Sequence, residues 1–133
     1  MNLFAYGTLM FPEIWERVVG GEFRHVPATV HGFSVYRAAG QLFPVMVAAG
    51  EHDSVAGIVI YDLTAAELAT LDAYESEIYE RINVSAALAD GCVEQAQAYL
   101  LPAAMRHLAS REPWTADWFR REAIAAYMKQ CGW

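Results

Sequence analysis

The stretch NLFAYGTLM, residues 2–10, decides where the fold begins. Its first half is apolar apart from Asn2, and so short an apolar run predicts a strand that is buried on both faces. Gly7 ends the run, because a residue without a β-carbon lets the backbone turn and approach other groups closely. Two interpretations follow for Tyr6-Gly7-Thr8-Leu9: a simple turn, or a loop whose backbone holds a ligand.

Strand and helix patterns alternate along the rest of the chain. Pro12 fits the first turn of a helix, and apolar residues at helical spacing continue that helix to Gly20. Stretches rich in β-branched and aromatic residues then predict strands, and Asp90-Gly91 predicts a hairpin between the last two. These strands are 23–37 with a bend, 42–48, 55–63, 79–88 and 93–101. The order predicts an α+β fold with a barrel or a strongly twisted sheet.

The segment after residue 63 carries the clearest helix signal. Thr64 and Glu67 match a capping box and predict a helix over residues 64–75. Leu68, Leu71 and Glu75 share one face of that helix, so an apolar stripe ends in a carboxyl group. Burial and the negative end of the helix dipole both raise the pKa of such a carboxyl. A shift from about 4.3 toward 6 or 7 would let Glu75 accept and donate a proton near neutral pH.

A structural role for Glu75 is the alternative. The side chain would then pair with Arg81 or cap a neighbouring loop. Asp72, one turn earlier, is expected to be structural and to bond a backbone amide or a hydroxyl group. Glu77 and Glu80 lie beyond the helix, in a segment that is expected to be exposed to solvent.

Length and composition predict a single domain over residues 1–133, with a barrel core at 1–102 and a helical C-terminal segment at 103–133. The hydrophobic fraction of 56% allows a real core and a homodimer face. The net charge of −7 and scattered basic residues disfavour nucleic acid. No apolar run spans a membrane and the N-terminus lacks a signal-peptide pattern, so a cytoplasmic location is expected. Histidine and cysteine spacings predict neither a metal site nor a disulfide.

Two motifs together resemble the γ-glutamylcyclotransferase-like superfamily. Residues 6–9 (YGTL) resemble its YGTL or YGSL signature, and 71–75 (LDAYE), with Tyr79 and Arg81, resemble its LDxxE…YxR segment. The resemblance covers residues 3–101 and is closest to the branch of γ-glutamylamine cyclotransferases and plant avirulence-induced proteins. Many members carry glycine where this chain has Ser76, which leaves the carboxyl group in place.

The resemblance implies a small mixed β-barrel flanked by helices, with no cofactor. It also implies an acyl transfer in which a γ-glutamyl amine or peptide cyclises to 5-oxoproline and releases its amine. Glu75 would be the catalytic acid and base. The amides of Gly7, Thr8 and Leu9 would form an anion site for the substrate, and the Thr8 hydroxyl would add a further donor. The aromatic side chains of Tyr6 and Tyr79 would line the substrate pocket. Weaker pocket candidates are Tyr36, Arg37 and Tyr99, and Arg81 is expected to brace the structure.

Other functions remain open at this point. The main alternative is a non-catalytic module that binds a γ-glutamyl compound or another small carboxylate. Removal of a γ-glutamyl protecting group would share the chemistry and differ in the leaving amine. A glutathione-specific cyclotransferase and a hydrolase with Cys92 as nucleophile are further alternatives, although Cys92 has no histidine nearby in the sequence.

Overall fold

A closed barrel forms the centre of the molecule in a computed structural model that describes residues 1–133. In spatial order its strands are β1 (Leu3–Ala5), β5 (Ser54–Ile60), β2 (His25–His31), β6 (Glu80–Leu88) and β7 (Val93–Leu100). A second sheet has the order β4 (Pro44–Ala48), β3 (Phe33–Ala38) and β8 (Ala109–Pro113). The predicted mixed barrel flanked by helices is confirmed.

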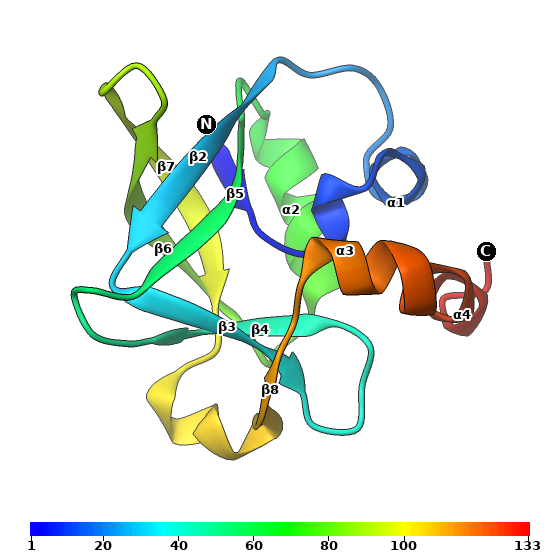
Figure 1. Ribbon diagram of the computed structural model, residues 1–133. Coiled ribbons are helices and arrows are strands. Elements are labelled where there is room, and N and C mark those ends of the chain that lie inside the picture. The colour runs from blue at the N-terminus through cyan, green and yellow to red at the C-terminus, as the bar shows by residue number, and fades with distance from the viewer.

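Helices lie beside the barrel (Figure 1). They are α1 (Pro12–Val18), α2 (Ala65–Glu75), α3 (Ala116–Trp118) and α4 (Ile124–Gln130), with a π-helical turn at Phe119–Ala123 and 3-10 turns at Thr8–Met10 and Ala103–Leu108. Figure 1 shows α1, α3 and α4 gathered on the side where the C-terminus lies, while the second sheet lies below the barrel. None of these helices is both long and apolar enough to cross a membrane.

Strand β1 closes the barrel although it has only three residues. It pairs antiparallel with β5, from Leu3 opposite Ile60 to Ala5 opposite Ile58, and parallel with β7 at Leu3. Gly57 of β5 makes this approach possible, because a β-carbon there would lie 2.3 Å from the Ala5 carbonyl oxygen. The barrel therefore closes only where β5 offers a residue without a side chain.

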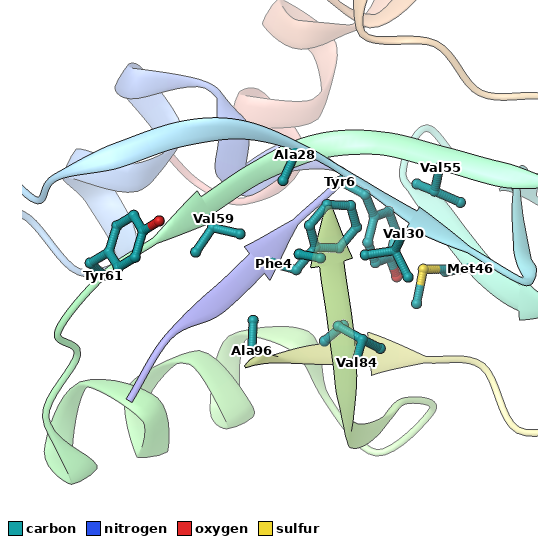
Figure 2. Close-up of a cluster of buried hydrophobic side chains, with 12 residues drawn as sticks. Phe4, Tyr6, Ala28, Val30, Met46, Val55, Val59, Tyr61, Val84 and Ala96 are labelled. Atoms are coloured by element: carbon teal, nitrogen blue, oxygen red, sulfur yellow. The ribbon is translucent and has the colours of Figure 1, made fainter. Parts of the chain in front are cut away.

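Both faces of β1 are buried, as the sequence predicts. Phe4 points into the barrel, where it meets side chains from the other strands and from β4 (Figure 2). Leu3 and Ala5 belong instead to the cluster that includes Leu68 and Leu71 of α2. The strand thus joins the barrel interior to the helix that carries the candidate carboxyl group.

The capping box of α2 forms as predicted. The Glu67 amide donates to Thr64 Oγ1 at 3.1 Å, and the Thr64 amide donates to Glu67 Oε1 at 2.8 Å. Leu68 and Leu71 are 2% and 0% exposed, so one face of the helix is fully buried. The cap fixes the start of the helix, and burial of this face fixes its rotation relative to the barrel.

Two predictions about the strands were wrong. The single bent strand over residues 23–37 is two strands, β2 and β3, in different sheets; they are separated by Gly32, whose φ of 90° only glycine adopts freely. The segment 103–133 is not helical throughout, because β8 precedes its helices. The exposed polar residues of β8 carry no alternating apolar pattern, and pairing with β3 gives the segment its extended form.

We expect Gly57→Ala to destabilise the protein by about 3 kcal/mol, because the new methyl group would meet the Ala5 carbonyl and the Phe4 ring. Chemical denaturation measures this difference. Ala56→Ser, at the exposed neighbouring position, is the control and should change stability by less than about 0.5 kcal/mol. A Gly57→Ala protein as stable as the wild type would contradict the proposed basis of barrel closure.

Candidate active site

A cavity of about 130 Å³ lies where the loop after β1 meets the end of α2. The predicted catalytic and substrate-binding residues all line it: Tyr6, Gly7, Thr8, Leu9, Glu75 and Tyr79. Of the weaker candidates, Tyr99 lines the cavity, whereas Tyr36 and Arg37 lie in β3, outside it. The remaining lining residues are Leu3, Phe4, Ala5, Phe43, Pro44, Tyr74, Ser76, Ile78 and Tyr127.

The Glu75 carboxyl is the only carboxyl group that lines the cavity, and no arginine, lysine or histidine lines it. Arg81, the predicted alternative partner of Glu75, pairs instead with Asp72 at 3.6 Å. Burial without a cationic partner raises the pKa of Glu75 to about 8. The direction agrees with the sequence-based expectation, and the shift exceeds the expected one. At neutral pH the Glu75 carboxyl group is therefore mostly protonated.

The loop after β1 places backbone amides at the cavity. None of the turn and loop hydrogen bonds is donated by the amides of Gly7, Thr8 or Leu9, and all three residues line the cavity. These amides are therefore candidates to bind an oxygen atom of a ligand. Gly7 is required by close packing, because a β-carbon there would lie 2.6 Å from Cγ of Pro44. Pro44 of β4 therefore packs directly against this loop.

Three tyrosines form walls with hydroxyl groups that are already engaged. Tyr6 donates to the Tyr99 carbonyl at 2.6 Å, and Tyr79 donates to the Pro44 carbonyl at 2.6 Å. Tyr99 in turn donates to Asp72 Oδ1 at 2.8 Å. Burial raises the pKa of all three tyrosines well above the ordinary value, so they stay neutral. Their rings shape the cavity and add no charge to it.

Asp72 joins α2 to the barrel. It accepts the Tyr99 hydroxyl from β7 and pairs with Arg81 of β6. The expectations that Asp72 bonds a hydroxyl group and that Arg81 braces the structure are therefore confirmed. These contacts fix the last turn of α2 and with it the position of Glu75.

Two further tyrosines were missed by sequence reasoning. The Tyr74 hydroxyl is hydrogen-bonded to Thr8 Oγ1 at 2.8 Å and also to the Tyr127 hydroxyl. Tyr74 directly precedes Glu75 in the LDAYE motif, and this position could have indicated that it lies at the site. No local sequence pattern indicates that Tyr127 lines the cavity, because α4 reaches the cavity only through packing of the C-terminal segment.

Residues 3–120 match the family model described as "Gamma-glutamyl cyclotransferase, AIG2-like". The chain belongs to this family. AIG2-like protein A of Arabidopsis thaliana is 36% identical over 83 residues, which are 62% of this chain and 50% of that protein. The chain thus spans about half the length of that curated relative.

Solved structures share the fold. The solution structure of an Arabidopsis thaliana protein is 23% identical, with a TM-score of 0.71 over 98% of this chain and 78% of that chain. A structure described as "Gamma-glutamyl cyclotransferase" is 22% identical, with a TM-score of 0.65 over 77% of this chain and 66% of that chain. At these identities the likeness supports the barrel architecture and leaves the reaction to be argued from the site.

The position after Glu75 is strained. Ser76 has φ 73° and ψ −177°, a conformation that is essentially restricted to glycine. We expect Ser76→Gly to raise the free energy of unfolding by about 1 kcal/mol, measured by chemical denaturation. Ser54→Gly, at the start of β5, is the matched control and should lower it. Equal effects of the two substitutions would show that Ser76 is unstrained.

The raised pKa of Glu75 also predicts how stability depends on pH. Between the ordinary glutamate pKa and about 8, the folded state holds a proton that the unfolded state releases, so stability falls as pH rises. Glu75→Gln removes this dependence. The free energy of unfolding of the variant, minus that of the wild type, should therefore rise by about 1 kcal/mol per pH unit from pH 5 to pH 8. Denaturation curves at several pH values measure it, and a constant difference would contradict the raised pKa.

Proposed function

We propose that this protein is a γ-glutamylcyclotransferase that converts a γ-glutamyl amine or peptide to 5-oxoproline and a free amine. The observation that carries the proposal is the Glu75 carboxyl, whose pKa burial raises to about 8 beside the unpaired amides of the loop after β1. Family membership supports the same reaction class. An acid of this pKa can gain and lose a proton near neutral pH, which is what the reaction requires.

The proposed reaction is an intramolecular acyl transfer. The α-amine of the γ-glutamyl group attacks its own γ-carbonyl, the new lactam C–N bond forms, and the C–N bond to the leaving amine breaks. Two protons pass from the attacking nitrogen to the leaving nitrogen, so the total charge is unchanged. Glu75 would carry them one at a time, first as base and then as acid. The incoming α-ammonium group lowers the pKa of Glu75 and thereby prepares the carboxylate form.

The loop after β1 would bind the negatively charged part of the substrate. The cavity lining contains no cation, so an α-carboxylate or a developing oxyanion must be held by neutral donors. The amides of Gly7, Thr8 and Leu9 are such donors, and they lie on one wall of the same cavity as Glu75. Binding at both points would bend the γ-glutamyl chain toward the geometry of attack.

We expect the wild type to release 5-oxoproline from at least one member of a panel of γ-glutamyl amines, γ-glutamyl dipeptides and glutathione. Glu75→Gln should reduce release at least about 100-fold while the protein stays folded, because an amide cannot exchange the proton. Glu77→Gln is the matched control, since Glu77 is exposed and does not line the cavity. Comparison across the panel identifies the leaving amine.

Two outcomes would overturn parts of this proposal. Full activity of Glu75→Gln would remove Glu75 from the mechanism. A folded wild type that binds 5-oxoproline but releases none from any substrate would support the second candidate, a non-catalytic binding module. The protonated state of Glu75 at neutral pH favours that candidate as well, because a neutral carboxyl does not repel an anionic ligand.

The pH profile gives an independent test. In the free enzyme Glu75 must lose its proton before it can act as the first base, and its pKa is about 8. We therefore expect kcat/KM of the wild type to rise up to about tenfold per pH unit from pH 6 to near pH 8. A kcat/KM that is constant over this range, measured by 5-oxoproline release, would contradict the assignment of the base.

A further inference from the structure

Three hydroxyl groups form a continuous chain at the cavity. Thr8 Oγ1 is 2.8 Å from the Tyr74 hydroxyl oxygen, which is also hydrogen-bonded to the Tyr127 hydroxyl. The three residues come from the loop after β1, from α2 and from α4, and all of them line the cavity. Thr8 is 5% exposed; its hydroxyl is hydrogen-bonded to that of Tyr74 and also lies beside that of Tyr127.

One of the three hydroxyl protons is not used in the hydrogen bonds of the chain. Three hydroxyl groups carry three protons, and the two hydrogen bonds between them use two. The third proton lies at one end of the chain, on Thr8 or on Tyr127. Its position depends on the direction in which the hydrogen bonds run.

Chemistry at the two ends favours Thr8 as the terminal donor. A phenol is a stronger acid than an aliphatic alcohol, so Tyr74 donates to Thr8 more readily than it accepts from it. At the other end Tyr127 has the Cys131 thiol beside it, and sulfur is a weak acceptor. The Tyr127 hydroxyl therefore donates its hydrogen bond to the Tyr74 oxygen rather than to sulfur. The Thr8 proton then faces the cavity, and each bond in the chain strengthens the next.

Packing of the C-terminal segment holds the Tyr127 end in place. Phe119 is 0% exposed, and its ring lies 5.1 Å from that of Phe11, 5.4 Å from that of Trp114 and 5.5 Å from that of Tyr127. Trp133 stacks on the Tyr74 ring with centroids 6.3 Å apart. Tyr127 lies outside residues 3–120, which match the family model.

We propose that Tyr127 of α4 is a positioning residue that acts through Tyr74 to present the Thr8 hydroxyl as a donor to an anionic oxygen of the ligand. The oxygen belongs either to the α-carboxylate of a γ-glutamyl ligand or to the oxyanion formed during ring closure. The inference rests on the proposed function for the identity of this ligand. The C-terminal helix is then part of the binding site rather than only a cover for the barrel.

A double-mutant cycle tests the inference with Thr8→Val, Tyr127→Phe and the double variant. We expect Thr8→Val to lower kcat/KM for the best panel substrate about tenfold, since it removes a hydrogen bond to a charged oxygen. Tyr127→Phe should lower it about threefold. The double variant should match Thr8→Val within about twofold, because Tyr127 acts only through Thr8. Tyr61→Phe, which removes a hydroxyl group outside the cavity, is the control and should leave kcat/KM unchanged.

The split between kinetic constants identifies the oxygen. A rise in KM at constant kcat places the hydroxyl on the α-carboxylate, and a fall in kcat places it on the oxyanion. If the wild type shows no turnover, the same cycle is measured as the dissociation constant of 5-oxoproline, which carries the same carboxylate. Circular dichroism and thermal unfolding verify that each variant is folded.

The outcomes separate this inference from the proposed function. Turnover with additive effects of the two substitutions, or with no effect of Tyr127→Phe, overturns the hydroxyl chain and leaves the cyclotransferase proposal standing. Coupled effects on 5-oxoproline binding without any turnover sustain the chain and overturn the proposed reaction. A wild type that neither turns over a substrate nor binds 5-oxoproline overturns both.

Discussion

Closure of the barrel by a three-residue strand is the constraint on which the rest of the molecule depends. Strand β1 pairs with β5 on one side and with β7 on the other, and it approaches β5 so closely that Gly57 has no room for a β-carbon. The chain leaves this strand directly into the loop that supplies Gly7, Thr8 and Leu9. Because the strand is fixed at both edges, the loop amides have one position relative to α2, which packs on the outer face of the same strand.

Two carboxyl groups one turn apart on α2 have different environments. Asp72 pairs with Arg81 and accepts a hydrogen bond from Tyr99, whereas Glu75 faces a cavity lined by apolar and neutral aromatic groups. If Arg81 paired with Glu75 instead, the nearby positive charge would lower the pKa of Glu75, and the carboxyl group would be ionised at neutral pH. Because Arg81 pairs with Asp72 and does not line the cavity, no cation lowers the pKa of Glu75.

Local patterns predicted the parts of the site that local interactions build. The apolar run before Gly7, the capping box at Thr64 and the stripe ending in Glu75 each act within one turn or one strand, and each formed as expected. The separation of β2 from β3 at Gly32 and the pairing of β8 with β3 depend on sheet contacts far apart in the sequence. The place of Tyr127 in the cavity depends on an aromatic cluster assembled from the two ends of the chain, and no spacing rule reports such a contact.

The strained residue Ser76 directly follows Glu75, the carboxyl group whose pKa burial raises. A strained backbone persists only where its surroundings over-determine it, and here the Ser76 amide donates to the carbonyl of Asp72 at 3.1 Å while Asp72 is tied to the barrel. Glu75 therefore lies between a fixed turn of helix and a conformation that serine disfavours. Both the strain and the unpaired burial are free-energy costs of keeping an acid in an apolar cavity, and packing of α2 against β1 offsets them.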